Sequence, residues 1–172
     1  MKRTVEALVR GVLMSMVNVT LPDGTVNEYA AGITAGEVVI DALGKKHGCL
    51  AARINDVERD LSTALNDDCN LEGILAESDD GMHILRHSAA HLLAQAVMEL
   101  YPDAKPTIGP AIDRGFYYDF AMEPIGEGDL KPIEKKMHEI ARRNLKVERV
   151  ELDETDLREH FTANPYKIEI ID

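Results

Sequence analysis

Two histidines four residues apart are the clearest candidates for chemistry in this sequence. The stretch Arg86–Ala96 reads RHSAAHLLAQA and carries His87 and His91. On a helix, residues at i and i+4 have Cβ atoms about 5 to 6 Å apart, so both imidazoles can reach one metal ion, one water or one substrate. The pair lacks the glutamate of the H-E-x-x-H zinc motif, and two imidazoles are half of a tetrahedral zinc site. From the residues alone, a pair of exposed or hydrogen-bonded histidines without chemistry stays an open alternative.

Other residues that could bind a substrate are weaker candidates. A basic cluster lies on a predicted helix, but glutamates are interleaved with it, which is typical of a solvated face rather than an RNA site. Tyr117 and Tyr118 either pack against a helix or contact a substrate. Lys167 stands beside Tyr166 in a predicted strand, a position that more often faces solvent. The basic cluster consists of Lys135, Lys136, Arg142 and Arg143.

Composition limits the classes of protein that need considering. The chain has 172 residues, 45% hydrophobic and 29% charged, which is typical of one globular domain or two small ones. Its formal net charge is -12, so no global attraction to nucleic acid or anionic membrane exists, and any RNA contact must be local. The two cysteines, Cys49 and Cys69, exclude a disulfide framework or a cysteine-rich zinc knuckle. No run of about 18 apolar residues is present, which excludes a membrane-spanning helix.

The first part of the chain is predicted to be a small α+β unit. VNVTLPDGTVNEYA alternates apolar and polar residues around a Pro-Asp-Gly turn, which predicts a hairpin with strands near 17–21 and 25–29. Residues 34–37 read as a capping box that opens a helix, and Gly44 or Gly48 can close it.

Short strands follow in CLAARIND, VERDLSTAL and NLEGILAES, giving the order strand, strand, helix, strand, strand. A helix across one face of a small mixed sheet buries both apolar surfaces, so residues 17–77 are expected to form a grasp-like domain. Residues 1–16 are interpreted as an N-terminal extension. The polar break at residues 78–81 is predicted to be a linker to a second domain over residues 82–172.

The second part contains longer elements. The apolar spacing predicts a helix over 82–100, stopped by Pro102, and a second helix over 130–146. Between them lies a loop with three prolines, long enough to be a functional loop. Residues 115–120 are predicted to be a strand with Phe116, Tyr118 and Phe120 on one face, and Tyr166–Ile171 a further strand. Residues 82–172 are therefore also expected to be α+β.

Several segments resemble one family. VTLPDGTVNEY, ITAGEVV and ARINDVERDL look like a TGS domain, a small ubiquitin-like β-grasp. RHSAAHLLAQAV, followed by IGPAIDRGFYYDF and NPYKIEIID, resembles the opening of the editing domain of threonyl-tRNA synthetases, which is similar to the editing domain of alanyl-tRNA synthetases. The resemblance covers nearly everything from Val17 to Asp172. It implies an α+β chain with a TGS domain and a partial editing domain.

The resemblance also implies roles for single residues. In the family, the editing domain hydrolyses serine wrongly attached to threonine tRNA. Carried over by motif, the catalytic histidines fall on His87 and His91, and the substrate-binding residues on Tyr118 and Lys167. Hydrolysis of an aminoacyl ester needs a positioned water, a group that takes its proton and donors for the oxyanion. Histidine, with an ordinary pKa near 6.5, suits the proton transfer, while tyrosine and lysine can orient the ester, the tRNA terminus or the water.

The sequence also departs from the family. The family completes the site with a cysteine and a histidine in a C-x-x-x-H segment beyond the YK strand, and the sequence does not contain it. The class II synthetase motifs, the catalytic zinc ligands and the anticodon-binding domain are absent as well. We therefore expect no metal and no cofactor in this chain, with ATP, Mg and Zn needed only for the missing catalytic domain. We expect neither aminoacylation nor efficient hydrolysis of Ser-tRNA(Thr) by this chain alone.

The leading hypothesis is thus the N-terminal part of a threonyl-tRNA synthetase, a ligase of protein biosynthesis. The expected partner is tRNA(Thr) in the full-length enzyme, which would be cytoplasmic, without a membrane contact and homodimeric as in the family, whereas this piece can be monomeric. Two alternatives stay open. One is a TGS-based RNA or protein binding module with an inactive editing remnant, and the other is a stand-alone trans-editing hydrolase.

Overall fold

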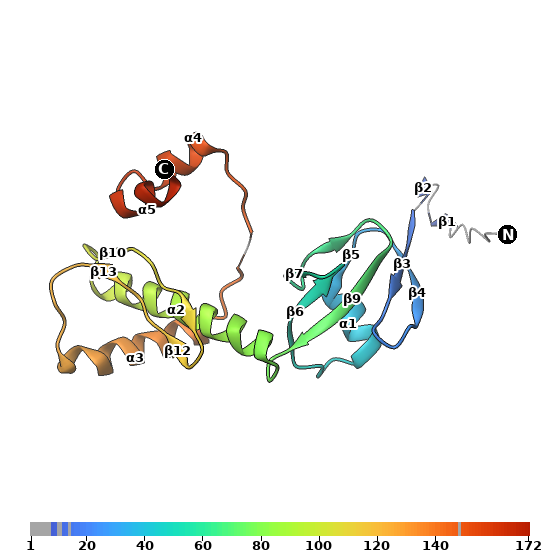
Figure 1. Cartoon of the computed structure of the whole chain (residues 1–172), viewed down its shortest axis with the longest axis horizontal. Helices are drawn as coiled ribbons and strands as arrows, with labels where there is room; N and C mark the ends of the chain where they lie inside the picture. The colour runs from blue at the N-terminus through green and yellow to red at the C-terminus, as the bar shows by residue number, and fades with distance from the viewer. Residues whose placement is uncertain (1–7, 10–11, 14, 148) are drawn as a thin grey trace. The chain divides into compact units, whose positions relative to one another are not determined.

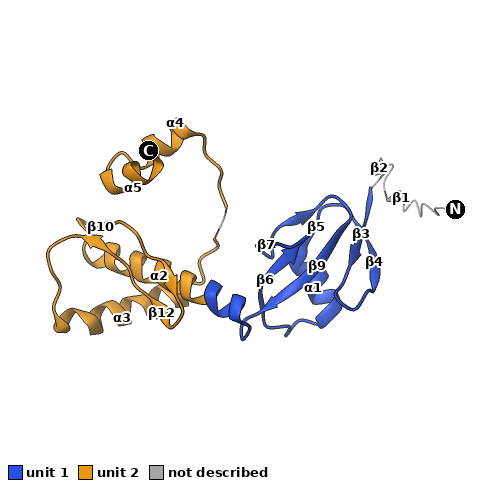
Figure 2. Ribbon diagram, viewed as in Figure 1, with its two compact units in different colours: residues 1–84 blue, residues 85–172 orange. Residues whose placement is uncertain are grey.

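The computed structural model describes most of the chain, and Figure 1 shows the course of its elements. The chain divides into two compact units, residues 1–84 and 85–172, which are described separately below (Figure 2). Most of the predicted extension 1–16 lies outside the described residues; within it, β1 Leu8–Val9 pairs with β2 Val12–Leu13. The described residues are 8–9, 12–13, 15–147 and 149–172.

A five-stranded mixed sheet is the frame of the first unit. Its strand order is β4-β3-β9-β6-β7, in which β3 and β9 run parallel and the other neighbours antiparallel (Figure 1). A separate short pair, β5 with β8, lies beside the sheet. The strands are β3 Met16–Thr20, β4 Val26–Ala30, β5 Ile33–Thr34, β6 Cys49–Ile54, β7 Val57–Arg59, β8 Ala64–Leu65 and β9 Cys69–Leu75.

The predicted hairpin at the start of this sheet is confirmed. Leu21 and Thr25 close the turn between β3 and β4, with the Leu21 N–H donating to the Thr25 carbonyl at 2.8 Å. Gly24 has a φ of 85°, in the left-handed region that glycine adopts without steric cost. The Asp23 carboxylate accepts the Thr25 N–H at 2.9 Å, which fixes the turn from within.

The capping box also forms as predicted. Helix α1 spans Ala35–Leu43, and its N-cap Thr34 accepts the Glu37 N–H at 3.3 Å. The Glu37 carboxylate in turn accepts the Thr34 N–H at 2.9 Å, so two donors left over at the helix start are satisfied reciprocally. Gly44, with a φ of 83°, ends the helix. The chain can therefore enter and leave α1 within a short span.

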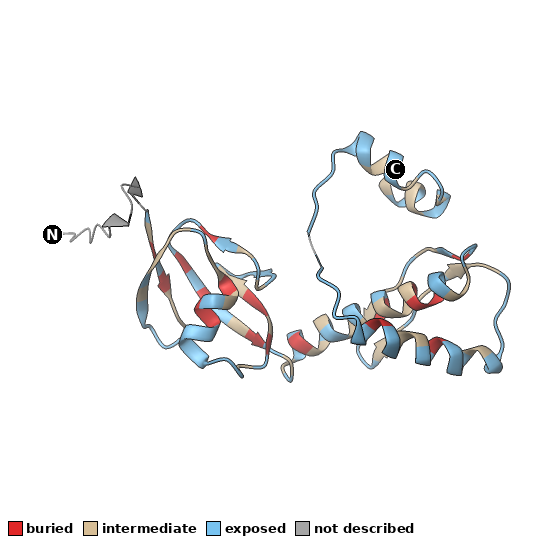
Figure 3. Ribbon diagram, turned by 180° about the vertical axis from the view of Figure 1, so that it is seen from behind, coloured by how far each residue is buried: buried red, intermediate tan, exposed pale blue. Residues whose placement is uncertain are grey.

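Helix α1 and the sheet bury one continuous core. Val38 and Val39 of α1 pack with Val17 and Val19 of β3, all at most 2% exposed. Figure 3 shows buried stretches in red on the helix and on the strands of this unit. A helix across one face of a mixed sheet is the predicted β-grasp arrangement. The remaining buried members of this core are Ala35, Cys49, Ala52, Leu65, Cys69 and Leu71.

Helix α2 begins earlier than predicted. It spans Asp79–Leu100, so most of the expected linker 78–81 forms its first turn. Ser78 starts it: the Ser78 hydroxyl accepts the Gly81 N–H at 3.0 Å and donates to the Leu75 carbonyl at 2.7 Å. The polar run that looked like a break is thus a helix start, because serine and acidic residues favour the N-terminal turn.

The second unit packs two helices with short strand pairs. Helix α3, Glu127–Arg142, lies with α2 around a small core, and β10 pairs with β13 while β11 pairs with β12 (Figure 1). No helix among the described residues is long and apolar enough to cross a membrane. The strands are β10 Lys105–Pro106, β11 Ala111–Ile112, β12 Gly115–Phe116 and β13 Phe120–Ala121. The buried core residues are Ala96, Val97, Ala104, Ile133 and Ile140.

The prediction of one strand over residues 115–120 is wrong in extent. The segment divides into β12 and β13, each of two residues, and the residues between them belong to neither. The alternation itself survives, since Tyr118 and Phe120 lie on one side with their rings stacked 4.8 Å apart. The break arises because β12 pairs back on β11 whereas β13 pairs with β10.

The prediction of a strand over Tyr166–Ile171 is wrong. After α4, Glu154–His160, the chain turns and forms helix α5, Pro165–Ile171. Pro165 occupies the first turn, where its fixed φ suits a helix and its missing N–H costs nothing. A helix satisfies its own backbone, whereas a strand needs a neighbouring edge, and none is paired with this segment in the described residues.

Candidate functional site

Helix α2 brings the two predicted histidines into direct contact. The Nε2 atoms of His87 and His91 lie 3.0 Å apart, and the rings meet edge to face with centroids separated by 4.6 Å. One nitrogen must donate and the other accept, so at least one imidazole is neutral while the contact persists. Both residues keep part of their surface open to solvent. A coupled pair that solvent can reach is therefore in place for proton transfer.

The surroundings of His91 favour its neutral form. Partial burial lowers the pKa of His91 below its ordinary value of 6.5, and the nearby His87 and Lys167 lower this pKa further. Each of the three effects disfavours a second positive charge at the site. Near pH 7, His91 can accordingly accept a proton from a water molecule.

Lys167 reaches this neighbourhood from α5. Its ammonium donates to the Thr107 carbonyl at 2.8 Å, and the side chain is half-buried. The Lys167 charge acts on His91 from this position. Two of the three ammonium protons are left for a ligand or water, since the Thr107 carbonyl takes one.

Tyr118 lies between β12 and β13, next to Asp119, which is bound to Thr107 just after β10. The Thr107 N–H and hydroxyl both donate to the Asp119 carbonyl, each at 2.9 Å. The Tyr118 ring covers Gly109 so closely that a Cβ there would overlap the ring atoms. Burial raises the pKa of the Tyr118 hydroxyl, which keeps it protonated as a donor.

The structure brings His87 and His91 into contact and places Lys167 within electrostatic reach of His91. Tyr118 precedes Asp119, whose carbonyl is bound by Thr107, and the Thr107 carbonyl is the one that Lys167 contacts. Sequence reasoning missed Asn164, whose side-chain N–H donates to the Pro106 carbonyl at 2.9 Å. The Asn-Pro dipeptide, a helix-start signal, could have drawn attention to it.

The basic cluster of α3 divides between two faces. Lys136 and Arg143 form ion pairs with Glu99 and Glu139, so these two cations support helix packing. Lys135 and Arg142 face a shallow open hollow instead. Among the described residues, no group of three His, Cys, Asp or Glu side chains could hold a metal ion, and the expectation of a metal-free chain stays a prediction.

Comparison with known proteins finds relatives for both units. Residues 17–74 match the TGS domain family. The first unit contains a TGS domain. The chain is also 45% identical to a threonine–tRNA ligase of Francisella tularensis subsp. holarctica and 44% identical to those of subsp. tularensis and subsp. novicida, over 91% of this chain. The predicted relationship to threonyl-tRNA synthetases is confirmed, as is the α+β fold with a β-grasp domain. The chain spans about a quarter of the length of these curated relatives.

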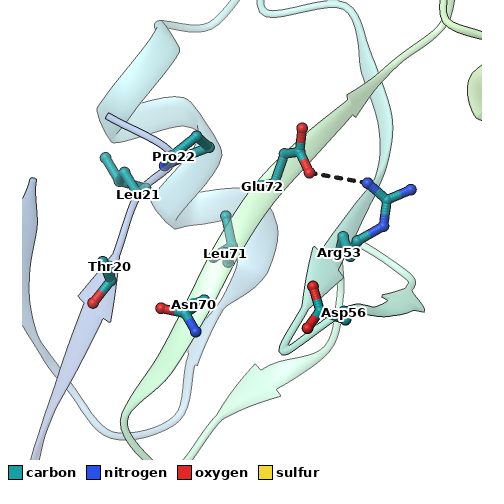
Figure 4. A pocket seen from close by; sticks show the side chains of 8 residues that line it. All are labelled: Thr20, Leu21, Pro22, Arg53, Asp56, Asn70, Leu71 and Glu72. Carbon is teal, nitrogen blue, oxygen red and sulfur yellow. Dashed lines mark hydrogen bonds and ion pairs between the residues drawn. The ribbon is translucent and has the colours of Figure 1, made fainter. Parts of the chain in front are cut away.

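The TGS domain carries a hollow of its own, of about 220 Å³ (Figure 4). Arg53 is its basic residue, but its guanidinium donates to Glu72 at 2.9 Å and to Asp80 at 2.6 Å. These carboxylates satisfy the charge that a ligand would otherwise meet, so the hollow offers no chemistry comparable to the histidine pair. Its lining residues are Thr20, Leu21, Pro22, Arg53, Asp56, Asn70, Leu71 and Glu72.

Proposed function

We propose that this chain contributes the TGS domain and part of the editing site of a threonine–tRNA ligase, and that the editing site hydrolyses serine from mischarged threonine tRNA. The observation that carries the proposal is the direct contact of His87 with His91 beside Lys167. The similarity to threonine–tRNA ligases over 91% of the chain supports a charged tRNA as the class of substrate.

Each of the four site residues has its own role in ester hydrolysis. His91, whose pKa is lowered, takes the proton of the attacking water. His87 exchanges that proton with it across the 3.0 Å contact. Lys167 directs its remaining protons toward the ester or a phosphate of the tRNA terminus, and Tyr118 donates from its hydroxyl.

The similarity of serine to threonine explains why a second, hydrolytic site is useful. Threonine differs from serine by one methyl group, which a binding pocket can exploit for only about 1 to 3 kcal/mol. A second site that hydrolyses the seryl ester raises the accuracy beyond that limit. The finer features of the whole enzyme, a class II ligase that acts on tRNA(Thr) as a cytoplasmic homodimer, belong to the same proposal.

Binding of a seryl-adenosine amide, a hydrolysis-resistant copy of the charged tRNA terminus, tests the proposal. With the histidine side chains labelled, NMR should show the resonances of His87 and His91 shifting together as the amide is added. Lys167→Ala should weaken binding at least several-fold. His83→Ala is the matched control, because His83 is exposed on the same helix one turn earlier, and it should bind like the wild type.

Two results would overturn the proposal. One is the absence of any histidine shift at a saturating concentration of the amide. The other is binding that His87→Ala and His91→Ala leave unchanged, since the histidine pair would then have no part in recognising the seryl ester.

A further inference from the structure

Asn164 connects β10 to the start of α5, the helix that carries Lys167. It lies in the turn between α4 and α5, where its N–H donates to the Phe161 carbonyl at 2.8 Å. Its side-chain N–H donates to the Pro106 carbonyl on β10 at 2.9 Å. Its own carbonyl accepts the Lys167 N–H at 3.0 Å, in the first turn of α5. One residue therefore attaches the start of α5 to β10 and also begins the helix turn that carries Lys167.

Two consecutive carbonyls at the end of β10, those of Pro106 and Thr107, accept hydrogen bonds from this region. Thr107 donates its N–H to the Asp119 carbonyl, but the Asp119 N–H returns to Ile108 rather than to Thr107. This irregularity of the ladder leaves the Thr107 carbonyl to the Lys167 ammonium. The Pro106 carbonyl just before it accepts from Asn164. The carbonyls of Pro106 and Thr107 are thus bound by the side chains of Asn164 and Lys167, respectively.

The orientation of the Asn164 amide is determined by its partner. Turning the amide over would place the Oδ1 atom against the Pro106 carbonyl, and two acceptors repel. In the orientation observed, Oδ1 is buried and has no hydrogen-bond partner. A buried acceptor left unpaired costs free energy, so the Nδ2 donor must be the interaction that fixes this side chain.

We propose that Asn164 is a positioning residue of the editing site, which holds Lys167 beside His91 by binding the Pro106 carbonyl. The inference rests on the proposed function of the same site. Loss of the Asn164 donor frees the start of α5, and the Lys167 ammonium then leaves its place near His91. Asn164 itself touches neither the reacting water nor the ester.

The pKa of His91, followed by NMR titration of the unliganded full chain, tests this role. Lys167→Met sets the scale, because removal of the ammonium should raise the pKa of His91 toward 6.5. Asn164→Ala and Asn164→Asp should raise it in the same direction, the latter because a carboxylate cannot donate to Pro106. Asn164→Gln, which retains a donor, should restore most of the wild-type pKa. Tyr166→Phe, exposed on the same helix, is the matched control and should change nothing.

The outcomes separate a positioning role from a purely structural one. If Asn164→Ala lowers the unfolding temperature but leaves the pKa of His91 at its wild-type value, the proposal is overturned. It is equally overturned if Lys167→Met does not move this pKa. The titration needs no substrate, so a chain that fails to bind the seryl amide yet shows the Asn164 effect would refute the proposed function alone.

Discussion

The TGS domain and the second unit use their polar residues in opposite ways. In the TGS domain, Thr34 and Glu37 satisfy each other and Arg53 is paired, while strands far apart in sequence enclose a core with Val19 and Val38 fully buried. In the second unit, Val97 is the one large side chain of the described residues that is buried to this degree. Of its candidate site residues, His87 and His91 are exposed, whereas Tyr118 and Lys167 are half-buried. The first unit therefore has the larger buried core, and the second leaves its histidine pair open to solvent.

The largest loss of stability is expected from a substitution in the TGS core. Leu71 lies on β9 in the middle of the sheet and is 2% exposed, so Leu71→Ala should lower the free energy of unfolding of that domain by about 2 to 5 kcal/mol. Leu75→Ala, on the same strand but 39% exposed, should cost much less. Urea unfolding measures both. Equal losses would show that β9 is not the centre of the core.

The start of α2 should be the next most sensitive place. A Cβ at Gly81 would overlap the Leu75 carbonyl, so Gly81→Ala should destabilise the chain by about 1 to 3 kcal/mol. Gly128 of α3 has open space around it, and Gly128→Ala should instead stabilise by about 0.5 to 1 kcal/mol. Thermal unfolding compares the two. A neutral Gly81→Ala would mean that α2 does not begin against Leu75.

Acid should affect the second unit through His91. Its pKa in the folded chain lies below 6.5, so the unfolded chain binds the proton more readily. The stabilising effect is fully present above pH 6.5 and is lost as the pH falls through the folded pKa. Urea midpoints of the second unit, followed by NMR from pH 8 to pH 5, should show this loss. His91→Gln should make the urea midpoint less dependent on pH. An unchanged pH dependence would show that groups other than His91 cause it.

The smallest effect is expected from the surface ion pair between α2 and α3. Arg143 donates to both carboxylate oxygens of Glu99, at 2.7 and 2.8 Å, but it is exposed and screened by water. Arg143→Met should therefore shift the urea midpoint only slightly, and less at 0.5 M salt than at 0.05 M. A loss of stability as large as that expected for Leu71→Ala would show that this ion pair is not a minor contribution.

The two units also differ in how well the sequence predicts them. The hairpin turn at Asp23 and Gly24 and the capping box at Thr34 depend on local chemistry, so both were predictable. The helical state of residues 165–171 was not, because YKIEII alternates like a strand and the preference is decided by Asn164 and Pro165 together with the contacts to β10. The start of α2 was misplaced for a similar reason: a polar run reads as a break until its hydrogen bonds are known.

The candidate site shows the same limit. The spacing of His87 and His91 predicts a shared helix face, and the resemblance supplied Tyr118 and Lys167. The Asn-Pro dipeptide could have marked Asn164 as a helix start, but its bond to a carbonyl 58 residues away could not be read from the sequence.

The most direct test of the account is the pKa of His91 in the wild-type chain and in His87→Ala, measured by NMR titration of labelled histidine. We expect a wild-type pKa below 6.5 that rises when His87 is removed, with His83→Ala leaving it unchanged. A His91 that titrates at 6.5 in all three chains would contradict it, because the two imidazoles would then be independent surface groups rather than a coupled pair.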